Sequence, residues 1–118
     1  NNYPYHKPPS DLDIPLPDNT DDKKYLSLLK KYLPNIITEI NPDFIFYLAG
    51  VDVLAEDKLG RLGLTLNGCK ERDELVFSLA KVSDIPIMTT MGGGYAPDIK
   101  IILEAHCNTF RRASNLFY

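Results

Sequence analysis

The sequence has little cysteine, and its cysteines form no recognisable motif. Only Cys69 and Cys107 occur in 118 residues. They cannot build the multi-bridge framework of a small secreted domain, and they lack the Cys-x-x-Cys spacing of many metal sites. The composition therefore favours a reducing compartment. We expect a cytoplasmic protein, or a nuclear one if the source is eukaryotic.

Excess positive charge and long apolar runs are also lacking. Thirteen Lys and Arg against sixteen Asp and Glu give a net charge of -3, which excludes a broadly basic protein, so no direct nucleic-acid binding is expected. The longest apolar run, residues 44–51, is far shorter than the roughly 20 residues of a membrane-spanning helix, and no membrane partner is expected. The chain opens with neither a methionine nor a signal-peptide pattern, and we expect it to be part of a longer protein.

The first 22 residues differ in composition from the rest. Five prolines and five aspartates fall within residues 1–22, among few aliphatic side chains. Such a segment cannot close a core of its own. We predict an extended connector over residues 1–22 and a folded part over residues 23–118. The apolar side chains available to dock the connector are Tyr3, Tyr5, Ile14 and Leu16.

Helical periodicity begins directly after the connector. Apolar residues recur at three- and four-residue spacing over residues 25–40, which predicts an amphipathic helix. Asn19 or Thr20 is predicted to cap its start. Pro34 is predicted to kink or split it, because proline removes a helical hydrogen bond.

Two short apolar segments, 44–48 and 86–90, predict strands, the first buried on both faces between helical layers. A helix over 66–81, capped by Thr65, lies between them, and a last helix begins near Pro97. Strand, helix and strand form a βαβ unit, which predicts parallel strands. Two strands make no stable parallel sheet, so the chain is expected to be the last portion of a larger α/β domain. The predicted buried stripes are Cys69, Leu75, Val76, Leu79 and Ala80 in the middle helix, and Ile99, Ile102, Leu103, His106, Cys107 and Phe110 in the last helix.

Two chemically versatile residues follow the predicted strands. In open α/β sheets, ligands bind beyond the carboxyl ends of the strands. Asp52 follows the first strand, and Tyr95 follows the second after three glycines, 92–94. The aspartate suits a metal ligand or general base and the tyrosine an oxyanion donor; a loop-bonding aspartate and a packed tyrosine are the alternatives. The glycines would let the backbone approach a ligand or let Tyr95 swing. They lack the Gly-x-Gly-x-x-Gly spacing, which disfavours a dinucleotide-binding protein.

Other polar residues favour structural roles. His6 is expected at the surface, and His106 is expected to be buried with its hydrogen bonds satisfied. The run 70–74 mixes both charges and predicts a solvated helix face with i,i+4 pairs. Arg111 and Arg112 are expected to complement the dipole at the end of the last helix.

Four motifs follow one another in the order Pro42-Asp43-Phe44 with Ala49-Gly50-Val51-Asp52, Asp57-Lys58-Leu59-Gly60, Leu64-Thr65, and Gly92-Gly93-Gly94-Tyr95. In this order they resemble the C-terminal third of histone deacetylases. The likeness is strongest over residues 41–105, and the runs 20–26 and 70–77 are most similar to the class IV branch. The sequence departs at Lys58, where many members have proline, and at Met91. Both departures would affect the mouth of the substrate channel rather than the chemistry.

The resemblance implies roles for individual residues. Asp52 matches a zinc ligand of the family, and Tyr95 matches the tyrosine that donates a hydrogen bond to the substrate carbonyl and its oxyanion. Gly93 and Gly94 match glycines that line the acyl-lysine channel, and Leu59 matches a position at its wall. The family's Asp-x-His zinc ligands and tandem histidines have no counterpart here; they belong to the earlier two-thirds of such a domain.

The resemblance thus implies the C-terminal portion of an arginase- and deacetylase-like three-layer α/β/α domain with a parallel sheet. The parent would be a zinc-dependent deacylase that hydrolyses an acyl-lysine or acyl-amine amide. This chain alone is expected to be inactive and to hold zinc weakly, its partner being the missing N-terminal part of the same domain. The alternative is a non-catalytic module that keeps the fold and binds an acyl group or a protein.

Overall fold

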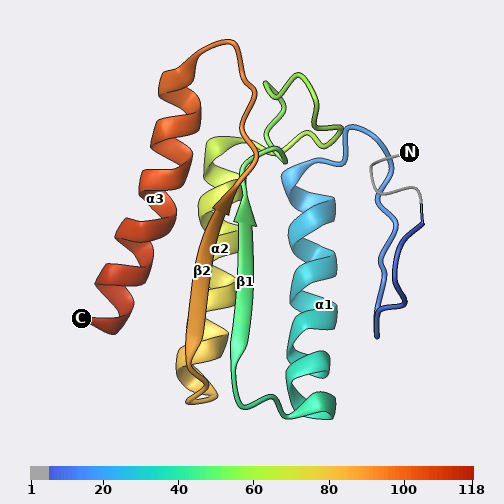
Figure 1. Ribbon diagram of the computed structural model, residues 1–118, viewed down its shortest axis with the longest axis vertical. Helices are drawn as coiled ribbons and strands as arrows, with labels where there is room; N and C mark the ends of the chain where they lie inside the picture. Colours follow the sequence, from blue (N-terminus) through green and yellow to red (C-terminus); the bar gives the residue numbers. More distant parts are fainter. Residues whose placement is uncertain (1–5) are drawn as a thin grey trace.

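The structure is a computed structural model that describes residues 6–118 (Figure 1). Residues 6–21 contain no helix or strand. Of the apolar side chains predicted to dock this segment, Ile14 and Leu16 are half-buried, whereas Tyr3 and Tyr5 lie outside the described residues. The element order is the predicted one, α1 (Asp22–Ile40), β1 (Ile45–Gly50), α2 (Leu66–Val82), β2 (Ile87–Gly92) and α3 (Ile99–Phe117).

The two strands form a parallel pair. Their register runs from Ile45 opposite Ile87 to Gly50 opposite Gly92, and α2 connects them, which confirms the predicted βαβ unit. The Val51 amide continues the ladder by donating to the Gly92 carbonyl over 2.9 Å. The loops that leave the two strands therefore begin side by side.

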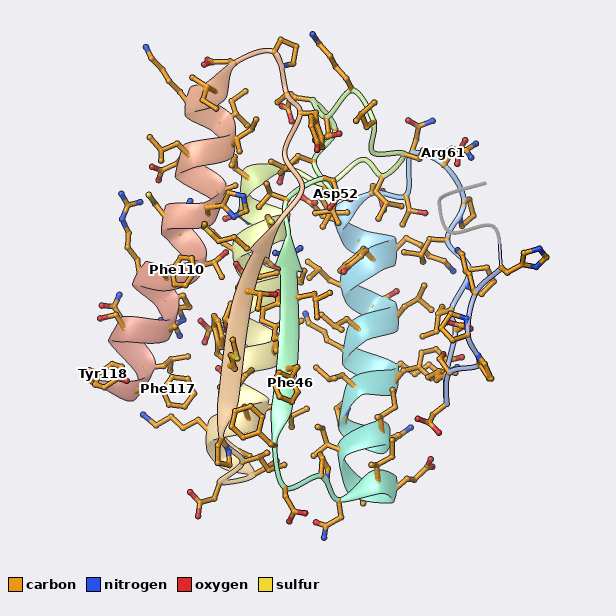
Figure 2. The ribbon with its side chains drawn as sticks, viewed as in Figure 1. Phe46, Asp52, Arg61, Phe110, Phe117 and Tyr118 are labelled. Atoms are coloured by element: carbon orange, nitrogen blue, oxygen red, sulfur yellow. The ribbon has the colours of Figure 1, made fainter. Side chains whose placement is uncertain are left out.

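Only one face of the strand pair is covered by helices. In Figure 1, α2 lies behind the strands and packs against α1 on one side and α3 on the other. Phe46 and Leu48, on the opposite face, are 69% and 76% exposed, and Phe46 points away from α2 in Figure 2. The prediction that this strand is buried on both faces is thus wrong for residues 6–118, because no second helical layer lies over it.

The core lies between the strands, α2 and the loop after β1. Val51 and Leu54, from that loop, pack with Cys69 of α2 and Ala105 of α3. Phe77 of α2 is fully buried. Its ring meets the ring of Tyr47 edge-on at 5.6 Å and that of Phe117 at 6.3 Å, a geometry that aromatic pairs favour.

The N-terminal caps differ from the predictions at one helix and agree at another. Asp21, not Asn19 or Thr20, caps α1 by accepting from the Lys24 amide. Thr20 lies one residue before this cap, and its hydroxyl donates to the Pro17 carbonyl over 2.7 Å. Thr65 caps α2 as predicted, accepting from the Gly68 amide at 3.0 Å.

Pro34 does not divide α1. The helix continues through it to Ile40. The Thr38 hydroxyl donates to the Pro34 carbonyl over 2.9 Å, within the turn that follows the proline. Of the helices within residues 6–118, none combines the length and apolar character that crossing a membrane requires.

The predicted stripe of α3 is confirmed only in part, because Ile102, His106 and Cys107 are half-buried and Ile102 packs against the core. Ala105 and Thr109 are buried against α2, whereas Ile99, Leu103 and Phe110 are 70%, 62% and 45% exposed. Small residues at the contact let the two helices approach closely, so the bulky residues point elsewhere. In α2, Cys69, Val76 and Ala80 are buried as predicted, but Leu75 and Leu79 are half-buried and line a groove against α1.

Candidate functional site

Asp52 stands at the carboxyl edge of the strand pair. Val51 is fully buried, and Asp52 turns out to solvent directly after it. Figure 2 shows Asp52 where the loops from both strands meet. Gly93 lies against this side chain, since a Cβ on Gly93 would come within 2.8 Å of the Asp52 Cβ, and Gly93 has φ of +64°. Only glycine satisfies both conditions without strain.

Asp57 ties the two loops together. Its Oδ1 accepts from the amides of Leu59 and Gly60 at 2.8 and 2.7 Å, and its Oδ2 accepts from the Tyr95 amide at 2.6 Å. Burial raises the pKa of this carboxyl, but the hydrogen bonds from Tyr95, Gly60 and Leu59 outweigh burial and leave the pKa below its usual value. Asp57 is therefore a charged brace between the loop after β1 and the loop after β2.

Tyr95 is fixed at its backbone and exposed at its ring. Its amide is bound by Asp57, while the residue as a whole is 57% exposed. Gly94, just before it, has φ of +110°, and a Cβ there would lie 2.7 Å from Cγ2 of Ile102. The glycines thus serve a tight turn against α3, and the freedom left to Tyr95 is that of its side chain.

The structure brings the predicted site residues to one edge. Asp52 adjoins Gly93, and Leu59 and Tyr95 share Asp57 as the acceptor of their amides. Leu59 is 68% exposed.

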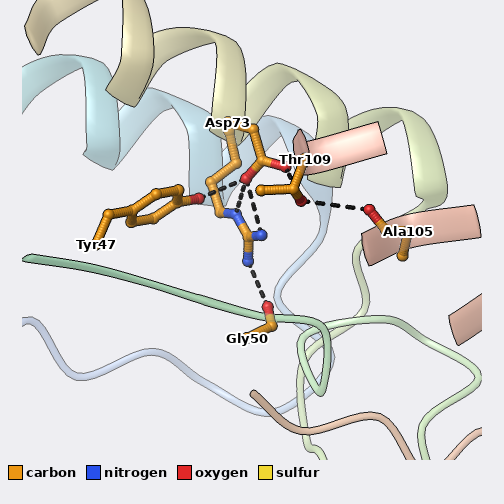
Figure 3. Close-up of polar contacts among 6 residues, drawn as sticks. Tyr47, Gly50, Asp73, Ala105 and Thr109 are labelled. Carbon is orange, nitrogen blue, oxygen red and sulfur yellow. Dashed lines mark hydrogen bonds and ion pairs between the residues drawn. The ribbon is translucent and has the colours of Figure 1, made fainter. Parts of the chain in front are cut away.

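One group of polar residues at this edge was missed. Arg72 and Asp73, predicted to lie on a solvated face, are only 3% and 1% exposed. Arg72 pairs with Asp73 and donates to the Gly50 carbonyl. Tyr47 and Thr109 are also bound to Asp73, as Figure 3 shows. A sequence signal existed, because these two residues fall on the helical stripe formed by positions 69, 72, 73, 76, 77 and 80.

Burial around this pair raises the pKa values of two neighbouring groups. It raises the pKa of the Cys69 thiol to about 11 and moves the pKa of the Tyr47 phenol well above its usual value. Both groups are therefore protonated at neutral pH. Tyr47 is a permanent donor to Asp73, and Cys69 packs as an apolar residue rather than as a reactive thiolate.

The two histidines and the two arginines of α3 make no hydrogen bond or ion pair with Asp52 or Tyr95 among the described residues. His6 is exposed, as predicted. His106 was expected to be satisfied, but its Nδ1 is buried without a hydrogen-bond partner among the described residues. Arg112 pairs with Glu74 of α2, and Arg111 pairs with Glu104 at 2.9 Å, so both make side-chain ion pairs.

The donor set for a metal is partial. Asp52 offers an exposed carboxylate, a donor that zinc accepts. Within the part of the chain that the structure describes, no group of three His, Cys, Asp or Glu residues could hold a metal ion. The residues present fit one ligand of a zinc site.

Comparison with known proteins gives consistent matches. A model of the histone deacetylase domain matches residues 5–110. An uncharacterized protein of Picosynechococcus sp. (strain PCC 7002) is 37% identical over 116 residues, which are 98% of this chain and 39% of that protein. Histone deacetylase 2 of Arabidopsis thaliana is 33% identical over 85 residues, 72% of this chain and 22% of that protein.

Among solved structures, the crystal structure of the HDA15 HD domain superimposes with a TM-score of 0.68 at 21% identity, and the match covers 82% of this chain and 27% of that one. This likeness concerns the fold. The chain spans well under half the length of these relatives.

Proposed function

The chain belongs to the histone deacetylase family, and on that premise we propose that it forms the C-terminal part of a zinc-dependent deacylase domain. Its fold is that of part of a deacetylase-like α/β domain with a parallel sheet. In the proposal, residues 1–22 are a connector and residues 23–118 are the C-terminal part proper. The class IV assignment stays a prediction from the runs 20–26 and 70–77.

The observation that carries the proposal is the joining of two loops at the carboxyl edge of the strands. Asp57 binds the loop that bears Leu59 and the loop that bears Tyr95, and Gly93 packs on Asp52. A carboxylate and a phenol are thus presented on one side of a fixed edge, where open α/β sheets bind their ligands.

Each residue has a role in the proposed reaction. Asp52 is one zinc ligand, and bound zinc would polarise the amide carbonyl and lower the pKa of water. The Tyr95 hydroxyl donates to the carbonyl oxygen as it becomes an oxyanion. Gly93, Gly94 and Leu59 line the channel that admits the acyl-lysine or acyl-amine side chain.

The partner that completes the site is the N-terminal part of the same domain. The open face of β1 and β2 carries Phe44, Phe46, Leu48 and Met88, all between 45% and 76% exposed. A contiguous apolar surface of this kind marks an interface. In the proposal it receives the remaining strands and helices, which also bring the other zinc ligands, and without them the chain is inactive.

The test compares Asp52→Ala with Asp57→Ala in a protein that contains this chain together with the rest of the domain. Elemental analysis would measure bound zinc, and hydrolysis of an acyl-lysine peptide would measure activity. We expect Asp52→Ala to lose both, whereas folded Asp57→Ala keeps its zinc and is mainly less stable.

The matched control is Asp11→Ala, in the exposed part of the connector, which should change neither quantity. Retention of zinc and normal turnover by Asp52→Ala would overturn the assignment. Acyl-peptide binding without any turnover in the unmodified protein would favour the non-catalytic module instead.

A further inference from the structure

Arg72 and Asp73 form an ion pair that is buried in the core. Both side chains are buried, and the pair has Nη2 to Oδ1 at 2.9 Å and Nε to Oδ1 at 3.0 Å. Taking two charges out of water is costly, and apolar residues of similar volume often stabilise a fold as well or better. Packing alone therefore does not account for this pair.

Asp73 is held from three elements. Tyr47 of β1 donates its hydroxyl to Oδ1 at 2.5 Å, and Thr109 of α3 donates its hydroxyl to Oδ2 at 2.6 Å. Together with Arg72 beside it on α2, these contacts leave the carboxylate a single orientation. Asp73 thereby fixes the guanidinium that it pairs with.

Arg72 also donates a hydrogen bond to the backbone of the site. Its Nη1 donates to the Gly50 carbonyl over 2.6 Å. The N–H of the same peptide unit, which belongs to Val51, donates to the Gly92 carbonyl over 2.9 Å. The Gly50–Val51 peptide is thus held at both its oxygen and its nitrogen, by α2 on one side and β2 on the other.

This peptide sets the direction of the next residue, Asp52. A peptide unit is planar, so fixing its two polar atoms leaves little rotation to pass along the chain. We propose that Arg72, oriented by Asp73, is a positioning residue that holds the Gly50–Val51 peptide and so aims the Asp52 carboxylate at the metal. The proposal rests on the proposed function, in which Asp52 is a zinc ligand.

The test removes the guanidinium while keeping the other hydrogen bonds. In the double variant Arg72→Met, Asp73→Asn, the new amide still accepts from Tyr47 and can donate to Thr109, whose hydroxyl then turns to the Ala105 carbonyl 3.3 Å away. No unpaired buried charge is left. The matched control is Lys70→Met, Glu71→Gln, on the exposed side of the same helix.

Zinc affinity would be measured by chelator competition, thermal unfolding by calorimetry, and exchange of the Val51 and Asp52 amides by mass spectrometry, on the protein with its complete domain. We expect zinc affinity to fall about 10- to 100-fold, as when partners of metal ligands are removed elsewhere. We also expect faster exchange at Val51 and Asp52, with a melting temperature close to the control's.

Zinc affinity within twofold of the control, with unchanged exchange, would overturn the proposal and leave Arg72 as a packing residue. If the double variant does not fold, Arg72→Lys serves, because it keeps the buried charge but lacks the planar guanidinium that bonds Asp73 and Gly50 from two separate nitrogens. The exchange measurement does not depend on zinc. Normal zinc binding by Asp52→Ala would therefore remove the proposed function, while the hold on the Gly50–Val51 peptide would still be tested.

Discussion

Tyr95 combines a hydrogen-bonded backbone with an exposed side chain. Its amide is bound to Asp57, and its ring stands in solvent beside the edge where Asp52 lies. In the proposed reaction the bound backbone limits the rearrangement that brings this donor to the oxyanion, and donors that need little rearrangement are the most effective. A hydroxyl on an anchored backbone needs only side-chain rotation to reach a substrate.

We expect Tyr95→Phe to slow the chemical step with little effect on folding. By analogy with other oxyanion donors, turnover should fall roughly 100- to 1000-fold, about 3–4 kcal/mol of transition-state stabilisation. Turnover, the Michaelis constant and zinc content would be measured together in the protein with its complete domain. Tyr32→Phe, on α1, is the control, and near-normal turnover of Tyr95→Phe would remove the hydroxyl from the mechanism.

Asp57 carries a prediction for stability and its dependence on pH. Asp57→Asn cannot accept at both ends, so the amides of Tyr95 or of Leu59 and Gly60 lose a partner, at a cost of about 1–3 kcal/mol in the free energy of unfolding. Because the folded-state pKa is lowered, the charge stabilises the fold above the unfolded pKa of about 4, and this contribution fades as pH falls through the folded pKa.

The stability difference between the wild type and Asp57→Asn should therefore be constant from about pH 5 to 7 and shrink in stronger acid. Chemical denaturation across this range would measure it. Asp11→Asn, which alters an exposed aspartate, should show no such difference. A gap that widens on acidification would contradict the assigned role.

At the scale of elements, the sequence pattern located the helices and strands that the structure describes. It wrongly predicted the exposure of charged residues that the fold buries. Thr65 was recognisable as a cap because it directly precedes the helical pattern of α2, whereas α1 begins two residues after Thr20 and is capped by Asp21. Arg72 and Asp73 read as surface residues because hydropathy ignores the partners that a fold supplies. Those partners, Tyr47 and Thr109, are far away in sequence.

The candidate site was also predictable only in part. Asp52 and Tyr95 could be placed at one edge by the βαβ rule and the resemblance, because strand ends are fixed by topology. The brace from Asp57 to the Tyr95 amide could not, since it joins two loops whose paths no periodicity describes.

α1 carries a prediction at Pro34. Proline within a helix removes the hydrogen bond to the carbonyl four residues earlier, and Pro34 is an exposed residue that lines the groove between α1 and α2. Pro34→Ala should raise the free energy of unfolding by about 1–3 kcal/mol. Denaturant titration would measure it, with Asn35→Ala, the exposed neighbour, expected to change it far less. A destabilised Pro34→Ala would show that the proline itself supports the fold.

At the scale of the whole molecule, the open face of the strand pair is a large exposed apolar surface. Phe46 and Leu48 project from it beside Phe44, whose ring lies 4.9 Å from that of Phe46. An exposed apolar sheet face is a site of association. We expect the chain on its own to self-associate through it.

Phe46→Thr with Leu48→Thr should weaken this association at least tenfold, because a loss of about 1.4 kcal/mol suffices for that change. Threonine suits a strand, so the fold should persist. Sedimentation would measure the effect. The control is Ile40→Thr with Val82→Thr, which removes two other exposed apolar residues, 52% and 83% exposed. Equal weakening by both pairs would show that the strand face has no special part.

The parallel register also bears on how the chain folds. Ile45 and Ile87 can pair only after the whole of α2 has been looped back between them. Closing that loop costs chain entropy before any ladder bond repays it, which makes such pairings slow. α1 and α2 can form from local contacts much earlier. The loops that bear Asp52 and Tyr95 leave the last paired positions, Gly50 and Gly92, so they become neighbours only once this slow pairing is complete, and a nascent or partly unfolded chain has no site.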